Sequence, residues 1–335
     1  MTALSIIIVN YKTPGLVIDC LETVYGQTSW PDFEVLVADN ASGDSSRELI
    51  LGKYPSVRWV QLNYNAGFAR ANNAAIRQSS GEAVLLLNSD TLVEDRAIER
   101  CYRELMASSY VAAGVQLLNP DRTPQISGNF FMKGGLNYLL PLPYLGGLVK
   151  WAGTLFRVAK PNVLQADSLV EVDWVNGAFL MVKRSAFDKA GLMDEDFFLY
   201  AEEAEWCSRL RPLGKICIYG QYHVIHLQGA SANETFGSTG RGYANLYDRK
   251  GLQIMLSTFV RIRKQFGVGW FLVQLFFYVV EIPVFAAALL ISVPGRAMRK
   301  RYSPAQFFKY CKNLGFVIGK SLIIIRNKPY FYKVL

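Results

Sequence analysis

The sequence predicts an α/β fold built on a doubly wound parallel sheet, and two patterns in its first third predict it. The first pattern is a series of short, continuous apolar runs, which are typical of strands buried on both faces, at residues 4–9, 34–38, 57–62 and 83–87. The second is a series of amphipathic stretches between these runs, which we expect to form helices at about 14–26, 44–53, 67–79 and 94–108. Strands and helices that alternate in this way form open α/β sheets.

Ligands of such sheets bind beyond the carboxyl ends of the strands, so the residues directly after each apolar run are the first candidates for a site. Polar residues occupy all four of these places: Asn10 and Tyr11, Asp39 and Asn40, residues 63–65, and residues 88–90. The sequence therefore predicts one polar site along one edge of the sheet.

The second half of the chain is less regular. Residues 119–167 are rich in Gly, Pro and aromatic residues, and two interpretations stay open: a long packed loop, or a surface that touches lipid or a lipid-borne substrate. After this segment we expect regular structure to return at 171–176, followed by a helix at about 202–213 and a short strand at 216–219.

Charge is unevenly distributed along the 335 residues. Residues 249–335 hold fifteen Lys and Arg and one acidic residue, Glu281, a net charge of +14, whereas residues 1–248 carry −5. We therefore expect two segments with different partners and divide the chain into domains 1–250 and 251–335. A hydrophobic content of 51% excludes a disordered chain, and five scattered cysteines without CxxC spacing favour a reducing compartment. The N-terminal MTALSIIIVN has no charged leader, so we expect a strand there and not a signal peptide.

The C-terminal domain has an apolar stretch at residues 267–294 that is long enough for a membrane span of about 20 residues. Basic residues lie on both sides of it, so the positive-inside rule places both of its ends in the cytoplasm. Because Glu281 and Pro283 lie near its middle, we expect a break there, in a re-entrant hairpin or two interfacial helices. The basic and apolar segment that follows is expected to lie on anionic lipid. A soluble helical appendage is the alternative, and nucleic-acid binding is disfavoured because the basic residues alternate with aliphatic runs.

Two groups of carboxylates are candidates for chemistry. Asp90 follows the run VLLLN and has the position of a ligand for Mg²⁺ or Mn²⁺, although an Asp after a strand is also a common cap or turn residue. Glu202, Glu203 and Glu205 begin an expected helix, where the helix dipole stabilises carboxylates. Crowding three of them among aromatic residues would also raise the pKa of one, which suits a general base.

Two further segments have both a structural and a functional interpretation. His223 and His226 follow an expected strand and are either structural residues or metal ligands. The segment Asn65 to Asn73 begins a helix with Asn65 and Gly67 at its start. The amides there either meet a diphosphate or are simply capped.

Seven segments, in this order, resemble the inverting family 2 glycosyltransferases of GT-A fold, and in particular their bacterial rhamnosyltransferase-like branch. The segments lie between about residues 4 and 250: IIIVNYK at 6–12, VADNASGDSS at 37–46, NAGFARANN at 65–73, LLLNSD at 85–90, WVNGAFLMVKR at 174–184, GLMDEDFFLYAEEAEWCSRL at 191–210 and HLQGAS at 226–231.

The resemblance implies a role for each matching residue. Asp90 and His226 would hold Mg²⁺ or Mn²⁺, while Asn88 occupies the place of the first carboxylate of the family's Asp-x-Asp motif. Glu203 takes the position of the catalytic base, which is usually Asp, with Glu202 and then Asp194 as the next candidates. Asp39 would accept a hydrogen bond from the imide of uracil or thymine. The complete set implied to bind the nucleotide sugar is Asn10, Tyr11, Asp39, Ser42, Asn65, Gly67, Asn88, Ser89, Trp174, Asn176, Gly177 and Arg249.

The sequence as a whole thus predicts a transferase at the cytoplasmic face of the inner membrane, peripheral or monotopic, with GT-A fold and C-terminal membrane-associated helices. Its expected donor is dTDP-L-rhamnose and its expected acceptor a polyprenyl-diphosphate-linked saccharide of a surface polysaccharide. Three alternatives stay open: a transferase for UDP-linked galactose, glucose or N-acetylhexosamine, a nucleotidyltransferase, and a noncatalytic module that binds nucleotide sugars at a membrane.

Overall fold

The structure is a computed structural model that describes residues 2–29, 32–227, 245–291 and 302–334. The chain divides into two compact units. Unit 1 comprises Met1–Phe130, Asn162–Phe198 and Glu202–Ala232, and unit 2 comprises Phe131–Pro161, Leu199–Ala201 and Asn233–Leu335. Unit 2 therefore combines the C-terminal part of the chain with residues 131–161. The domain boundary between residues 250 and 251 stays a prediction.

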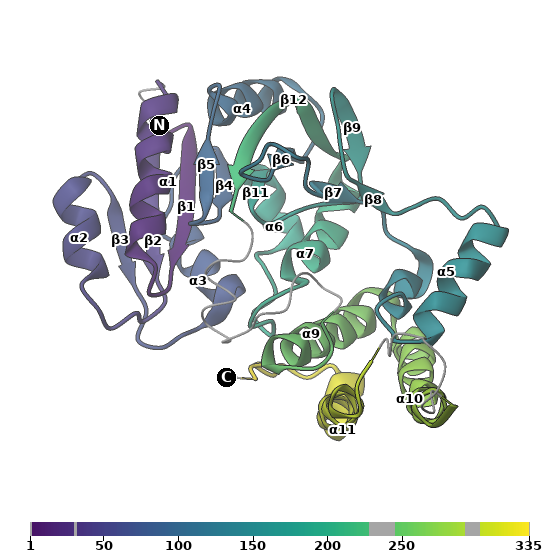
Figure 1. Cartoon of the computed structure of the whole chain (residues 1–335). Helices are drawn as coiled ribbons and strands as arrows, with labels where there is room; N and C mark the ends of the chain where they lie inside the picture. The colour runs from purple at the N-terminus through teal and green to yellow at the C-terminus, as the bar shows by residue number, and fades with distance from the viewer. Residues whose placement is uncertain (1, 30–31, 228–244, 292–301, 335) are drawn as a thin grey trace. The chain divides into compact units, whose positions relative to one another are not determined.

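Unit 1 is built on a nine-stranded mixed sheet (Figure 1). Four strands on one side of it are parallel, in the order β3-β2-β1-β4, and they lie where the apolar runs predict them: β1 (Leu4–Asn10), β2 (Phe33–Asp39), β3 (Arg58–Gln61) and β4 (Ala83–Leu87). The sheet continues from β4 through β11 (Phe179–Lys183), β6 (Ala112–Leu118), β12 (Ile216–His226) and β5 (Thr91–Val93), while β9 (Leu169–Val172) pairs with β12. Antiparallel pairs join β4 to β11, β11 to β6 and β12 to β5. A smaller sheet joins β10 (Trp174–Val175), β7 (Gly128–Asn129) and β8 (Asn162–Val163).

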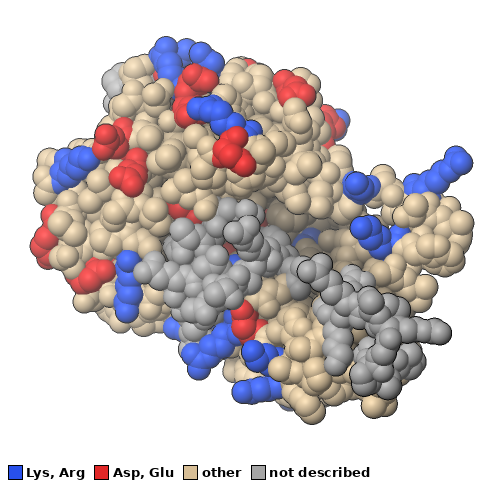
Figure 2. Space-filling view, viewed as in Figure 1, with Lys and Arg blue, Asp and Glu red and all other residues tan. Residues whose placement is uncertain are grey.

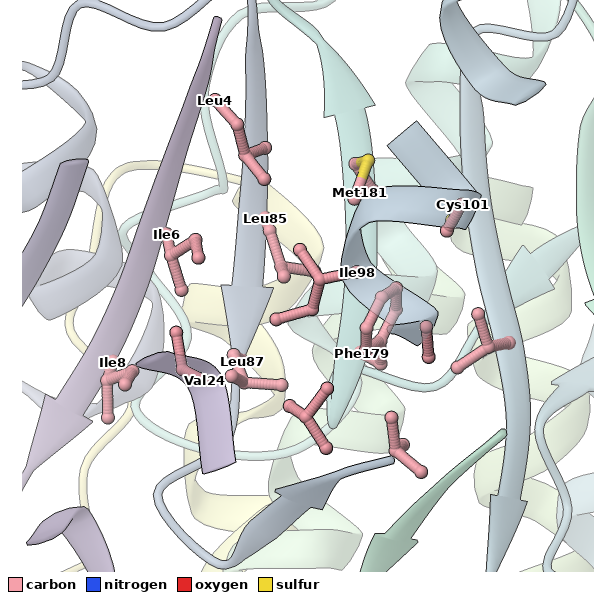
Figure 3. Packing of buried hydrophobic residues seen from close by; sticks show 14 of the residues in the cluster. Leu4, Ile6, Ile8, Val24, Leu85, Leu87, Ile98, Cys101, Phe179 and Met181 are labelled. Atoms are coloured by element: carbon pink, nitrogen blue, oxygen red, sulfur yellow. The ribbon is translucent and has the colours of Figure 1, made fainter. Parts of the chain in front are cut away.

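Alternate residues of the central strands pack on opposite faces, because successive side chains of a strand point to opposite sides. Ile6 and Ile8 of β1 pack with residues of α1 (Pro14–Gln27), α2 (Ser46–Lys53) and α4 (Ala97–Ala107), and Figure 3 shows part of this core. Ile7 belongs to the opposite core, with α3 (Gly67–Ile76), α6 (Phe187–Ala190) and α7 (Glu202–Leu210). Both faces are thus covered, which explains why these strands are continuous apolar runs. Two 3₁₀ turns, Arg184–Ala186 and Arg211–Leu213, complete this part.

Unit 2 is helical. It contains a 3₁₀ turn at Lys133–Leu139 and the helices α5 (Leu145–Leu155), α9 (Arg249–Phe266), α10 (Val268–Ile291) and α11 (Pro304–Arg326). Two of the helices have clear start signals: the Asp248 side chain accepts from the Gly251 amide at α9, and Ser303 and Gln306 form a capping box at α11. The Tyr310 hydroxyl of α11 donates to the carbonyl of Tyr278 in α10 (2.7 Å), so these helices pack as one body.

Three predictions about secondary structure are wrong in part. Residues 119–167 are not one long loop, because they contain β7, β8, the 3₁₀ turn and α5. The strand predicted at 216–219 continues to His226, because β5 and β6 pair with its second half, and the predicted helix 202–213 ends as an α-helix at Leu210.

The expected break at Glu281 and Pro283 is also wrong, since α10 runs through both residues. A proline costs a helix one hydrogen bond and a local clash. Tyr278 and Phe285, on either side of Pro283, are both buried in unit 2, and we attribute the continuity of the helix to this packing.

Candidate active site

The ends of β1 and β2 carry a buried polar cluster. Parallel pairing places Asn10 beside Asp39, and Asn10 Nδ2 donates to Asp39 Oδ1 (2.8 Å) and to Ser42 Oγ (3.1 Å). Both the hydroxyl and the amide of Ser42 donate to the carboxylate of Asp39. The structure therefore brings together three of the residues predicted to bind the nucleotide.

Gln61, at the end of β3, completes this cluster, and sequence reasoning missed it. Its Nε2 donates to Asp39 Oδ2 (2.8 Å), so each oxygen of Asp39 accepts two hydrogen bonds. A carboxylate has about four lone-pair positions, and the protein thus fills them. A nucleobase N–H could reach Asp39 by displacing Gln61, which is exposed to solvent. Asn10 Oδ1, by contrast, is a buried acceptor that has no partner among the described residues.

Tyr11 follows directly after β1 and is half-buried. The ammonium group of Lys12 lies 5.6 Å from the centre of its ring, and the Lys12 amide donates to Ser42 Oγ (2.9 Å). Tyr11 therefore lies beside the polar cluster of Asp39, and the hydrogen bond from the amide of Lys12 to Ser42 holds the backbone at this position.

One interpretation of Asn65 and Gly67 requires free backbone amides at the start of α3, which would bind a diphosphate. In the structure, three of these amides already donate hydrogen bonds within the protein. The amides of Ala66, Gly67 and Phe68 donate to Asn40 Oδ1 (2.7 Å), Asn65 Oδ1 (3.1 Å) and the carbonyl of Phe198 (2.8 Å). This corrects the expectation of a diphosphate held by these amides. Gly67 is needed for another reason: its φ is +75°, and a Cβ there would lie 2.0 Å from the carbonyl oxygen of Phe198.

A second cluster lies where β4 ends and β5 begins. Antiparallel pairing places His226, the last residue of β12, beside Thr91. As a result, His226 Nε2 lies 3.3 Å from Asp90 Oδ1 and 3.4 Å from Asn88 Nδ2. Asp90, Ser89 and His226 are buried. The two residues predicted as metal ligands therefore meet, whereas residues 228–231 of the HLQGAS segment lie outside the described residues.

Gln125 orients His226, and it is a second residue that sequence reasoning missed. Its Nε2 donates to the carbonyl of His226 (2.6 Å), so its Oε1 is the acceptor for His226 Nδ1 (3.0 Å). The proton on Nδ1 fixes the ring, and Nε2 faces the carboxylate of Asp90.

A carboxylate and an imidazole that converge in this way suit a divalent cation such as Mg²⁺ or Mn²⁺. Among the described residues there is no group of three or more His, Cys, Asp and Glu side chains that would surround an ion. An ion held by Asp90 and His226 would therefore take other ligands from water or from substrate phosphates. Under this site, burial raises the pKa of the Cys20 thiol, and the negative charge of Asp90 raises it further.

Helix α7 carries the candidate base. Glu202, Glu203 and Glu205 are all buried, but Glu205 forms a two-pronged ion pair with Arg209, with both distances 2.8 Å. Glu205 is therefore structural. Asp194 caps a turn, since its Oδ1 accepts from the amide of Asp196 (2.9 Å). Glu203 and Glu202 are the stronger candidates of the predicted three.

The loop after β10 lies between Glu203 of α7 and the end of β4. A Cβ on Gly177 would lie 3.7 Å from the Cβ and Cγ of Glu203, and the carbonyl of the next residue, Ala178, accepts from the amide of Asn88 (3.1 Å). Asn176 Oδ1 accepts from the Ala178 amide (2.9 Å) and shapes this turn. Glu203 therefore lies one short turn away from the strand end that carries Asn88 and Asp90.

Trp174 is half-buried in β10, opposite Asn129 and three residues before Gly177. Two other residues singled out in the sequence lie elsewhere. His223, on the same strand as His226, points to other acids, with Nε2 3.3 Å from Glu94 and 3.6 Å from Asp95. Arg249 is the exposed first residue of α9 in unit 2, and its role toward a nucleotide sugar stays a prediction.

Comparison with known sequences shows a family that part of this chain resembles. Residues 5–157, which include β1, β2, Asp39 and Asp90, match the profile described as "Glycosyl transferase family 2". This part of the chain is therefore similar to glycosyl transferase family 2.

Relatives of this chain with descriptive names include the following two. The low-salt glycan biosynthesis hexosyltransferase of Haloferax volcanii is 29% identical over 217 residues, which is 62% of this chain and 61% of that protein. The N-acetylglucosaminyl-diphospho-decaprenol L-rhamnosyltransferase of Mycobacterium tuberculosis is 28% identical over 202 residues, which is 55% of this chain and 63% of that protein. The match spans less than two thirds of either relative.

Among solved structures, a mannosyltransferase from Pyrobaculum calidifontis in complex with GDP-Man and Mn²⁺ has a similar fold. The TM-score is 0.54 with 15% sequence identity, over 95% of this chain and 86% of that chain. Together with the match to the family profile and the mixed sheet, this likeness confirms the predicted GT-A fold.

Proposed function

We propose that this chain transfers a sugar from a nucleoside diphosphate to an acceptor hydroxyl with inversion at the anomeric carbon. The observation that supports this most directly is that Glu203 lies beside Gly177, where an added Cβ would be 3.7 Å from its side chain, because the same turn holds Asn88 at the end of β4. A candidate base and a candidate diphosphate site then share one short loop.

Glu203 is the proposed general base. It lies in the first turn of α7, and the lack of a side chain at Gly177 leaves space beside its methylene groups. In the transfer, the acceptor oxygen forms a bond to the anomeric carbon as its proton moves to Glu203. The bond from that carbon to the diphosphate oxygen breaks, and the nucleoside diphosphate leaves with the electron pair. One displacement on the face opposite the leaving group inverts the configuration.

Asp90 and His226 would hold Mg²⁺ or Mn²⁺ at the diphosphate, with Asn88 beside them. When bound, such an ion neutralises the negative charge of the diphosphate. Asp90 keeps its position through its backbone as well, since its carbonyl accepts from the Leu227 amide (2.9 Å).

The donor is proposed to carry thymine or uracil, which Asn10 and Asp39 would bind. The buried Oδ1 of Asn10 is the acceptor that a base N–H would satisfy, and displacement of Gln61 would open a second one on Asp39. Of the two kinds of donor we favour dTDP-L-rhamnose, because one relative is named as an L-rhamnosyltransferase. UDP-linked hexoses and N-acetylhexosamines are the alternative.

The acceptor is proposed to be a saccharide on a polyprenyl diphosphate at the cytoplasmic face of a membrane. The same relative is named for a decaprenol-linked substrate. In this chain α10 is long and apolar enough to cross a membrane by length and composition, and the segment around it is strongly basic. Both properties suit a protein that works at an anionic bilayer surface.

A donor screen tests the proposal. The full chain in membranes is given dTDP-L-rhamnose, UDP-glucose, UDP-galactose or UDP-N-acetylglucosamine, with and without a lipid-linked acceptor, and release of nucleoside diphosphate is measured. Acceptor-dependent release of dTDP is the expected result. Release of UDP alone supports the alternative donors, and donor binding without release of nucleoside diphosphate supports a noncatalytic module. A parallel assay with a nucleoside triphosphate and a sugar 1-phosphate tests for a nucleotidyltransferase, which would release pyrophosphate.

A further inference from the structure

Helix α10 has a buried face and an exposed face, although both are largely apolar. The fully or nearly fully buried residues recur at intervals of three and four: Phe271, Gln274, Tyr278, Glu281 and Phe285. This spacing places them in one stripe along the helix. The large exposed residues of the helix are apolar, with Phe276 exposed to 62% and Leu290 to 74%.

The polar residues of the buried stripe bind the segment that precedes α5. Gln274 Nε2 donates to the carbonyls of Gly134 (3.0 Å) and Gly135 (2.8 Å), and the Tyr278 hydroxyl donates to the carbonyl of Tyr138 (2.9 Å). Gly134 itself packs against Trp270, leaving no space for a side chain. One face of α10 is therefore buried against other residues of unit 2, and only the opposite face is available to lipid.

Glu281 sets the position of α5. Its two carboxylate oxygens accept from the amides of Tyr144 and Leu145, each at 2.9 Å, where α5 begins. A carboxylate at this place satisfies amides that a helix start leaves unpaired and complements the helix dipole. The one acidic residue of the C-terminal segment thus ties α5 to the most apolar helix of the chain.

The helix held in this way exposes an apolar surface of its own. Leu148, Trp151, Leu155 and Phe156 follow helical spacing, and Trp151 is exposed to 63% and Phe156 to 77%. Large apolar side chains gathered on one helix mark an interaction surface and not the scattered exposure of an ordinary surface.

Charge identifies the partner of this surface. Residues 131–161 contain four basic residues, Lys133, Lys150, Arg157 and Lys160, and no Asp or Glu. The last three are exposed beside the apolar residues, and Figure 2 shows Lys and Arg side chains projecting around α5. A helix that combines Leu, Trp and Phe with Lys and Arg has the composition of helices that lie in the interface of anionic membranes.

We propose that α5 inserts Trp151 and Phe156 into the surface of an anionic bilayer, and that Glu281 fixes it there relative to α10. Unit 2 would then contact the membrane through two helices, with α10 lying along the bilayer surface and not crossing it. This inference rests on the proposed function, because a lipid-linked acceptor requires the chain to work at a bilayer.

A nitroxide label tests the proposal on the full chain. Trp151→Cys is introduced with Cys311→Ser, because the other four cysteines are buried and do not compete for the label. Leu49→Cys on α2 of unit 1, half-exposed at 50%, is the matched control. With vesicles of phosphatidylcholine and phosphatidylglycerol, we expect the label at 151 to become accessible to oxygen and protected from a water-soluble relaxation agent, and the label at 49 to stay in water. A label at 151 that stays in water while the chain sediments with the vesicles overturns the proposal and leaves α5 as a surface for a soluble partner.

A second pair of variants measures the contribution to binding. Because Trp151 and Phe156 are exposed, Trp151→Ser with Phe156→Ser should leave the fold intact and weaken binding to these vesicles by about a hundredfold or more. Leu49→Ser with Tyr64→Ser, two exposed residues of unit 1, should leave binding unchanged, and equal effects of the two pairs would contradict the proposal. The proposed function is scored separately, by transfer to a short-chain, water-soluble acceptor analogue. If the unmodified chain does not catalyse that transfer, the proposed function is contradicted, whereas the proposed insertion of α5 into the bilayer is not.

Discussion

His226 Nε2 lies 3.3 Å from Asp90 Oδ1, because β12 extends far enough to pair with β5 and carries its last residue to the end of β4. The two residues are far apart in the sequence, so local structure alone would not bring them together. The contact depends on the orientation of the imidazole, and that orientation depends on Gln125, which holds both the ring and the backbone of His226.

We predict that Gln125→Leu weakens the affinity for Mn²⁺ by about tenfold to a hundredfold, the usual cost of losing a partner that orients a ligand. Without the acceptor at Oε1, the ring of His226 loses its preferred tautomer and rotates. Titration of the purified chain with Mn²⁺, followed by electron paramagnetic resonance of the free ion, measures the change without turnover. Gln165→Leu, at an exposed glutamine, is the control, and equal affinities of the two variants would show that Gln125 has no such role.

Helix α7 carries both Glu203 and Glu205. The sequence around them does not distinguish their roles, but the structure does. We predict that Glu203→Gln lowers kcat by about 10² to 10⁴, the range for loss of a general base, with donor affinity unchanged. Glu205→Gln should keep turnover, because Glu205 pairs with Arg209, and should instead lower the free energy of unfolding. Single-turnover kinetics and urea unfolding of both variants measure these effects. Full turnover by Glu203→Gln would move the role of base to Glu202.

How much of this site the sequence predicts depends on the range of the interactions. Asn10, Asp39 and Asp90 could be predicted, because buried strands are visible as apolar runs and the polar residues that end them are visible as interruptions. Asn10 and Asp39 then meet by the simple register of neighbouring parallel strands.

Gln61 and Gln125 could not be predicted in this way. Their partners are Asp39 and His226, and no local pattern relates Gln125 to a residue of a strand far along the chain. The same holds for Glu281. In the sequence it is a charged residue within an apolar stretch, and only the fold shows that its carboxylate contacts the start of α5. Periodicity describes what one element buries, whereas these contacts depend on which elements the fold brings together.

The backbone at Gly67 gives a test of the α3 start. We predict that Gly67→Ala lowers the free energy of unfolding by at least about 1–2 kcal/mol, because an L-residue is strained at a φ of +75° and the new Cβ meets the carbonyl oxygen of Phe198 at 2.0 Å. Gly52→Ala is the matched control. Gly52 lies near the end of α2, and a Cβ added there would meet no atom within 4 Å, so alanine there should stabilise the chain by about 0.5–1 kcal/mol. Urea unfolding compares the two variants, and similar midpoints would contradict the account of Gly67.

Glu99 predicts how stability depends on pH. Burial alone would raise the pKa of this carboxyl, but the hydrogen bond from Arg96 and the charges of Arg103 and Arg96 outweigh burial and hold the pKa below its ordinary value of 4.5. A group whose pKa is lowered by folding stabilises the folded state above its unfolded pKa, and this stabilisation disappears as the pH falls through the lower, folded pKa. Glu99→Gln should therefore destabilise the chain at pH 7 and have progressively less effect as the pH falls below 4.5. Urea unfolding at a series of pH values measures the difference from the unmodified chain, with Glu48→Gln, at an exposed position of α2, as the control. A destabilisation by Glu99→Gln that stayed constant down to the lowest pH would mean that the ion pairs with Arg96 and Arg103 contribute nothing and that the effect comes from packing alone.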